Sequence, residues 1–156
     1  MPMKVISAID PISEVKVTEI LRANQVVTHL IPLFLESVSA GFPSPADDYI
    51  EMRLDLNDYL IKNPAATFFV RVTGDSMKNA GIFSGDILVV DRSLDPKDGS
   101  VVIAVIDGEL TVKRLSRESN RIFLLPENNN YQPIEISEEM GFEVWGVVRT
   151  VIHSVM

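Results

Sequence analysis

One dipeptide, Asp107-Gly108, constrains the fold of this chain more than any other sequence feature. It separates two runs rich in β-branched and apolar residues, 100–106 and 109–114. A two-residue Asp-Gly loop between such runs is a strong hairpin signal, because Asp and Gly tolerate the positive φ angles that a type I′ turn requires. The sequence therefore predicts an antiparallel β-hairpin here.

The register of this hairpin places a lysine on an apolar surface. With a two-residue loop, Ile106 pairs with Glu109 and Val102 pairs with Lys113, and paired residues share a face. Alternation along each strand puts almost wholly apolar neighbours on the face of the lysine, namely Val102, Ala104, Thr111 and Leu115. The opposite face carries Val101, Ile103, Val105, Leu110 and Val112. A strand that is apolar on both faces is internal, so we expect Lys113 to lie inside the fold.

Further strand signals surround the hairpin. They occur at 67–73, 86–90, 121–125 and 142–155, where aromatic and β-branched residues dominate. A short helix is expected at 56–62, with Asp55 as its N-cap and Pro64 as its stop. The expected fold is mostly β, a compact barrel or folded sheet.

The chain divides at Gly41-Phe42-Pro43-Ser44-Pro45, because two prolines and a glycine interrupt regular structure. We expect an N-terminal arm, residues 1–40, and a β-rich catalytic and dimerisation domain, residues 41–156. The apolar pieces of the arm, such as 30–35, are expected to be extended segments that lie on the body. A segment of roughly 40 residues rarely folds alone. The sequence offers no account of residues 1–16.

Composition excludes several classes of protein. The net charge of −8 disfavours direct DNA binding, which depends on Lys and Arg neutralising phosphates. Without cysteine, the chain has no disulfide, thiolate metal site or cysteine nucleophile, which fits a cytoplasmic protein. We expect no membrane segment, cofactor or metal, and we interpret Asp47-Asp48 as a solvated turn.

Two residues suggest serine and lysine chemistry. Burial disfavours the ammonium form of a lysine and lowers its pKa, so Lys113 is a candidate general base. Its alternative is a structural lysine that extends its amine to water. Ser76 follows a strand in the turn Gly74-Asp75-Ser76-Met77, where a neutral lysine could accept its proton. The backbone amides of Asp75 and Ser76 are candidate oxyanion donors, although an ordinary polar turn has the same composition.

The pair Ala40-Gly41 ends the arm. Small residues allow another backbone to approach closely, and a tethered bond can be delivered to a nucleophile at an effective concentration of ~10⁵–10⁸ M. By itself, an Ala-Gly pair beside prolines is more typical of a linker.

Taken together, these residues resemble the UmuD branch of the LexA-type self-cleaving family. The resemblance runs in order through about residues 30–152 and is carried by Ala40–Ala46, Gly74–Met77, Gly85–Asp91, Asp107–Lys113 and Phe142–Val148. It implies that Ser76 is the nucleophile, Lys113 the general base and Ala40–Gly41 the scissile bond. It also implies a LexA and signal-peptidase type of β fold.

The same resemblance implies partners. They are a second copy of the chain, a RecA filament on single-stranded DNA that stimulates cleavage in the SOS response, and a UmuC-like translesion polymerase subunit that receives the product 41–156. Two alternatives remain: a polymerase accessory module that does not cleave itself, and a fragment of a LexA-type repressor. The repressor fits less well, because the arm is too short for a helix-turn-helix domain. Neither His29 nor His153 has a motif around it that indicates a catalytic role.

Overall fold

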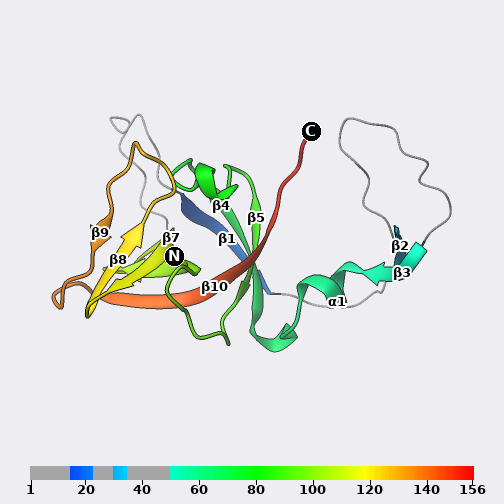
Figure 1. Cartoon of the computed structure of the whole chain (residues 1–156), viewed down its shortest axis with the longest axis horizontal. Coiled ribbons are helices and arrows are strands. Elements are labelled where there is room, and N and C mark those ends of the chain that lie inside the picture. The colour runs from blue at the N-terminus through cyan, green and yellow to red at the C-terminus, as the bar shows by residue number, and fades with distance from the viewer. Residues whose placement is uncertain (1–14, 23–29, 35–49) are drawn as a thin grey trace.

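The computed structural model describes residues 15–22, 30–34 and 50–156 (Figure 1). Strands dominate, as the sequence predicts. They are β1 (Lys16–Arg22), β2 (Leu30–Phe34), β3 (Ile50–Asp55), β4 (Thr67–Thr73), β5 (Ile87–Asp91), β6 (Val101–Ile106), β7 (Glu109–Glu118), β8 (Arg121–Leu125), β9 (Ile134–Glu135) and β10 (Phe142–Ile152). The helices are α1 (Leu56–Leu60) and two 3-10 turns, Pro64–Ala66 and Lys78–Ala80.

Six strands close into an antiparallel barrel in the order β1-β4-β5-β10-β6-β7, and β8 and β9 extend the sheet beyond β7. Strand β1 completes the closure. It pairs with β4 along its length and meets β7 through one pair, Lys16 with Thr111. The expected mostly β, barrel-like fold is confirmed.

The β6–β7 hairpin has the predicted register. Ile106 pairs with Glu109 and Val102 pairs with Lys113. The loop residues Asp107 and Gly108 have φ angles of 48° and 83°, the left-handed values that a two-residue turn requires. Because the turn fixes the register, it also decides which face of β7 carries each side chain.

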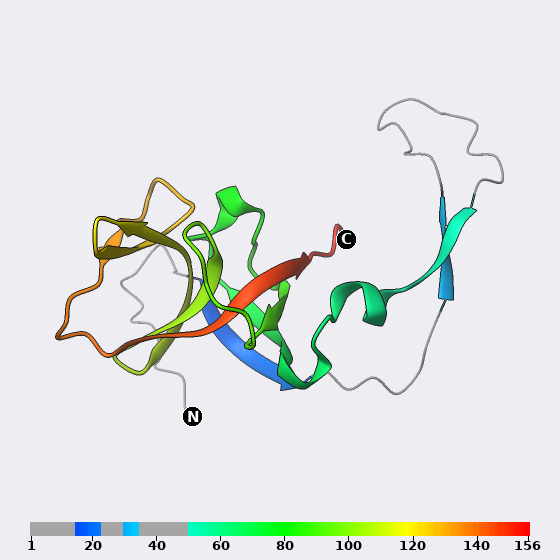
Figure 2. The ribbon, with the colours of Figure 1, turned by 60° about the horizontal axis from the view of Figure 1, so that its bottom comes forward.

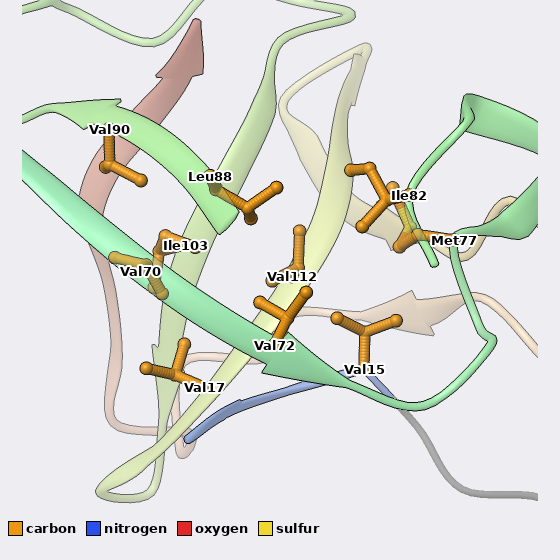
Figure 3. Packing of buried hydrophobic residues seen from close by; sticks show 10 residues of the cluster. All are labelled: Val15, Val17, Val70, Val72, Met77, Ile82, Leu88, Val90, Ile103 and Val112. Atoms are coloured by element: carbon orange, nitrogen blue, oxygen red, sulfur yellow. The ribbon is translucent and has the colours of Figure 1, made fainter. Parts of the chain in front are cut away.

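Two hydrophobic clusters form on the two faces of this hairpin. The inner cluster fills the barrel with side chains from β1, β4, β5, β6, β7 and the turn after β4 (Figure 3). Ile103 and Val112 belong to it. The second cluster contains Val102, Ala104, Leu115, Leu124 and Val147, on the side covered by β8 and β9. Both faces of β7 are therefore buried, which is the environment expected for Lys113.

Strand β1 was not expected from the sequence. Val15 and Val17 are buried in the inner cluster, but the residues after them are largely exposed, so the apolar alternation is too short to predict a strand. Tertiary pairing with β4 gives this segment its conformation. The division into an arm, 1–40, and a body, 41–156, stays a prediction, although β1 comes from the first of these and belongs to the barrel.

Strands β2 and β3 pair with each other and stand apart from the barrel, connected to it by α1 (Figures 1 and 2). The strand at 30–34 confirms the extended segment expected there, but its strand partner is β3. Asp55 caps α1 as predicted, its Oδ1 accepting a hydrogen bond from Asn57 N at 2.9 Å, and the helix ends at Leu60, two residues before the predicted end.

Candidate active site

Ser76 lies in a tight turn between β4 and the 3-10 turn at Lys78–Ala80. Gly74 ends the strand with a φ of 97°, a conformation that glycine adopts without steric cost. The side chain of Ser76 is 0% exposed. Its carbonyl oxygen accepts a hydrogen bond from Glu127 N at 2.8 Å. The buried hydroxyl of Ser76 therefore belongs to a residue whose backbone is fixed by a hydrogen bond.

Lys113 lies on β7 and is also 0% exposed. Its Nζ donates to Thr111 Oγ1 at 2.8 Å and to Val112 O at 3.4 Å. Thr111 and Leu115 share its face of the strand, and Val102 is its cross-strand partner. The side chain is enclosed and does not extend its amine to water, so the alternative of a snorkelling lysine is wrong.

The backbone of Val15 connects the two candidate residues. Val15 N donates to Ser76 Oγ at 2.9 Å, and Val15 O accepts from Thr111 Oγ1 at 3.3 Å. Thr111 Oγ1 in turn accepts from Lys113 Nζ. The structure thus brings Ser76 and Lys113 to one site, where the backbone N–H of Val15 faces Ser76 and its C=O faces Thr111 beside Lys113.

A loop after β8 supports the serine turn, and the sequence interpretation missed it. Asn128 is buried, and its Nδ2 donates to Asp75 O at 2.9 Å. Tyr131 OH donates to Asp75 Oδ1 at 2.7 Å. Asn128 stands in a run of three asparagines, and composition does not distinguish the one buried member from its exposed neighbours.

Asn128 orients the candidate oxyanion donor at Ser76. A peptide unit is planar, so the direction of Asp75 C=O fixes the direction of Ser76 N–H on the opposite side of the same plane. Fixing the carbonyl through Asn128 therefore aims the amide. That the amides of Asp75 and Ser76 bind an oxyanion stays a prediction.

Glu127 couples the serine turn to the lysine strand. Its backbone N–H holds Ser76 O, and its carboxylate forms an ion pair with Arg114, the residue after Lys113. Arg114 also donates to Gly99 O at 2.7 Å. The two candidate catalytic residues are thus positioned by one connected set of contacts.

The other sequence candidates lie elsewhere. Ala40, Gly41, His29 and the pair Asp47-Asp48 are outside the described residues. His153 Nδ1 lies 2.6 Å from Asp86 Oδ1, in a contact that involves neither Ser76 nor Lys113. Within the described ranges, no group of three or more His, Cys, Asp or Glu side chains is arranged to hold a metal ion. Nor does this part of the chain contain a helix of the length and apolar character needed to cross a membrane.

A buried serine and a buried lysine, connected through Val15 and Thr111, fit a peptidase that uses no histidine. Residues 32–149 match the profile of the family described as Peptidase S24-like. The chain belongs to the Peptidase S24-like family. This family is one of serine autoproteases, and the match includes both candidate catalytic residues and the Ala40-Gly41 pair. Strand β1 lies before the matched region.

Three relatives are similar to this chain over most of its length. Protein SamA of Salmonella typhimurium is 56% identical over 122 residues, 78% of this chain and 84% of SamA. Protein ImpA of Escherichia coli is 48% identical over 132 residues, 81% and 86% of the two chains. Protein MucA of Escherichia coli is 46% identical over 121 residues, 77% and 82%.

These relatives are UmuD-like, self-cleaving S24 proteins of SOS mutagenesis. The resemblance to the UmuD branch and the expected enzyme class are therefore confirmed for this S24 chain.

Proposed function

We propose that this S24 protein cuts its own Ala40–Gly41 bond with Ser76 as nucleophile and Lys113 as general base. The observation that carries the proposal is the complete burial of both side chains at one site. Ser76 Oγ accepts a hydrogen bond from the backbone of Val15, and Lys113 is connected to the same backbone through Thr111. In such surroundings a lysine favours its neutral form, because burial penalises the ammonium.

The chemistry proceeds in two steps. Neutral Lys113 Nζ accepts the proton of Ser76 Oγ as the oxygen attacks the carbonyl carbon of Ala40. The bond to Gly41 breaks, and the proton passes from Lys113 to the departing Gly41 amine. Lys113 then takes a proton from a water molecule as the water attacks the Ala40 ester, the bond to Ser76 Oγ breaks, and Lys113 returns the proton to Ser76 Oγ. The amides of Asp75 and Ser76 stabilise the negative oxygen in both steps.

Mass spectrometry of the purified protein tests this proposal. We expect a fragment that begins at Gly41 and its absence in Ser76→Ala and Lys113→Ala. Ser84→Ala and Lys62→Ala, which replace exposed residues of the same types, should release the fragment at the normal rate. An intact chain at alkaline pH and with RecA filaments would contradict the proposal.

We further propose that the cytoplasmic product, residues 41–156, acts as a homodimer with a UmuC-like translesion polymerase subunit. A RecA filament on single-stranded DNA is the proposed stimulus for cleavage. Identity of 46–56% to UmuD-like proteins supports these partners. In cells, Ser76→Ala should abolish damage-induced mutagenesis, and supplying 41–156 directly should restore it. Full mutagenesis in the Ser76→Ala strain would instead favour an accessory module that works without cleavage.

A further inference from the structure

The barrel has an opening between β4 and β7, and a segment of the chain fills it. Strand β1 pairs with β4 from Lys16 to Arg22 and pairs with β7 through Lys16 and Thr111. In both ribbon views β1 runs alongside β4 (Figures 1 and 2). Without β1, β4 would present an unpaired edge, and so would the part of β7 that precedes its pairing with β8 at Arg114. Unpaired edges of this kind bind an extended peptide by strand addition.

The strand is anchored at the active-site end and weakly held at the other. Val15 and Val17 are buried in the inner cluster, Val15 at the same end as Met77 (Figure 3). After an irregularity in the register between Val17 and Glu19, the side chains become exposed, and Leu21 is 49% exposed. The two buried side chains, two residues apart, define two apolar subsites, and the first belongs to the residue that contacts Ser76.

While Val15 lies against Ser76, a scissile peptide cannot reach the serine hydroxyl. The N–H of Val15 is 2.9 Å from Ser76 Oγ, and its C=O accepts from Thr111, the partner of Lys113. A scissile carbonyl must approach Ser76 Oγ from the same space. The carbonyl of Val15 points to Thr111, on the lysine side of the site. The segment is thus bound across the nucleophile with its carbonyl engaged elsewhere.

The cleavage segment has the side-chain pattern that these subsites require. Val38-Ser39-Ala40 places aliphatic side chains two residues apart, as Val15-Lys16-Val17 does. The strands that flank the cleavage segment in sequence, β2 and β3, stand apart from the barrel (Figure 2). β1 is in the groove while those flanking strands are outside it.

We propose that the groove between β4 and β7 is a peptide-strand site, that Val15–Arg22 is its resident occupant, and that this strand must leave before Val38–Ala40 can bind. Given self-cleavage as proposed above, the segment is an internal competitor of the scissile bond. It lies before the matched family region, residues 32–149.

A reversible lock tests the proposal in the full-length protein. Glu19 and Arg71 are cross-strand partners on β1 and β4, both exposed, with Arg71 Nε 3.4 Å from Glu19 Oε2. The chain contains no cysteine, so Glu19→Cys with Arg71→Cys creates a single disulfide that holds β1 in place. Two readouts apply: release of the Gly41 fragment, and labelling of Ser76 by a small fluorophosphonate, which needs only access to the hydroxyl.

We expect the oxidised double variant to be at least about tenfold slower in both readouts than the same protein after reduction. Glu118→Cys with Arg121→Cys, cross-strand partners at the exposed end of the β7–β8 hairpin, is the matched control. Its oxidation should change neither rate.

Equal rates in the oxidised and reduced β1-locked protein would overturn the inference and leave the proposed function intact. If the lock slows labelling of Ser76 but even the unmodified protein never releases a fragment at Gly41, the strand occupies the site as inferred and the proposed self-cleavage fails.

Discussion

A lysine that serves as a base must lose its charge, and Lys113 is placed where the charge is costly. Its side chain is buried on a strand whose two faces pack against separate apolar clusters. The hydroxyl oxygen of Thr111 accepts a hydrogen bond from Lys113 Nζ and so fixes the direction of the amine. Burial therefore makes Lys113 suitable as a base, because it disfavours the charged amine, and the proposed reaction uses neither a histidine nor a metal.

The pH dependence of self-cleavage follows from this placement. Because the base must be neutral, the first-order rate should rise with pH until Lys113 is deprotonated and then level off. Lys113→Arg should be inactive at every pH, since guanidinium stays charged. Rates of fragment release between about pH 6 and 10 measure this. A flat profile would contradict the assignment of the base.

Asn128 acts through the peptide unit that it holds. Asp75 C=O accepts from Asn128 Nδ2 and, at 3.2 Å, from Lys78 N. Asn128→Ala removes the shorter of these two hydrogen bonds and loosens the aim of Ser76 N–H, so we expect cleavage to slow by about tenfold to a hundredfold. The pH at which the rate reaches half its maximum should not move, because Lys113 is untouched. Asn129→Ala, an exposed neighbour, is the control. A shifted pH midpoint in Asn128→Ala would show that the asparagine acts on the base instead.

At the scale of elements, local sequence predicts the strands that carry their own signal. The register of the β6–β7 hairpin was predicted correctly, because Asp107-Gly108 fixes both turn and register, although β7 continues to Glu118, beyond the predicted end at residue 114. The face of Lys113 follows from that register. Strand β1 has no such signal, since its conformation depends on the groove that receives it. The meeting of Ser76 with Lys113 depends on barrel closure, which spacing along the chain does not encode, so it came from resemblance alone.

The hairpin turn can be tested through Gly108. A Cβ at this position would meet nothing within 4 Å, so Gly108→Ala adds backbone strain at φ +83° without a clash. We expect the free energy of unfolding to fall by about 1–2 kcal/mol. Gly141→Ala has only ordinary contacts, the nearest to Asp107 Oδ1 at 3.6 Å, and should cost less. Urea unfolding of both variants gives the comparison, and equal losses would argue against strain in the turn.

Asp91 ties the end of β5 to its surroundings. Burial raises the pKa of its carboxyl, but hydrogen bonds from Ser93 and Asn63 and the nearby Arg149 outweigh burial and hold the pKa below its ordinary value. A lowered pKa means that the charged form stabilises the fold. This contribution is complete above the ordinary carboxyl pKa and is lost as pH falls through the lowered value.

Asp91→Asn should therefore lower the free energy of unfolding at pH 7 by about 2 kcal/mol. It should also flatten the loss of stability in acid, because the titrating group is gone. Asp95→Asn, at an exposed position, is the control. Urea unfolding at pH 7 and near pH 3 measures both effects, and an unchanged acid slope would refute the role of Asp91.

At the scale of the whole molecule, the strand that closes the barrel and the bond proposed to be cut belong to one covalent arm. β1 precedes Ala40–Gly41 in the chain, while β4 and β7 follow it. After cleavage the barrel is a complex of two chains. Its thermal midpoint should then rise with protein concentration, by mass action.

Thermal unfolding of cleaved protein at two concentrations tenfold apart checks this. Intact Ser76→Ala protein corrects for any dependence that dimerisation contributes. Added synthetic peptide 1–40 should raise the midpoint of the cleaved sample only. No difference between the cleaved and intact samples would mean that β1 contributes nothing to closure.

The cover formed by β8 and β9 has a consequence of its own. These strands enclose the face of β7 that carries Lys113, yet neither supplies a group to the proposed reaction. If β8 and β9 separate from β7, water reaches Lys113 Nζ and favours its protonated form. Ser76 then has no group to accept its proton. Activity therefore depends on whether β8 and β9 are folded. Substitutions that unfold these two strands should abolish cleavage before the barrel itself unfolds.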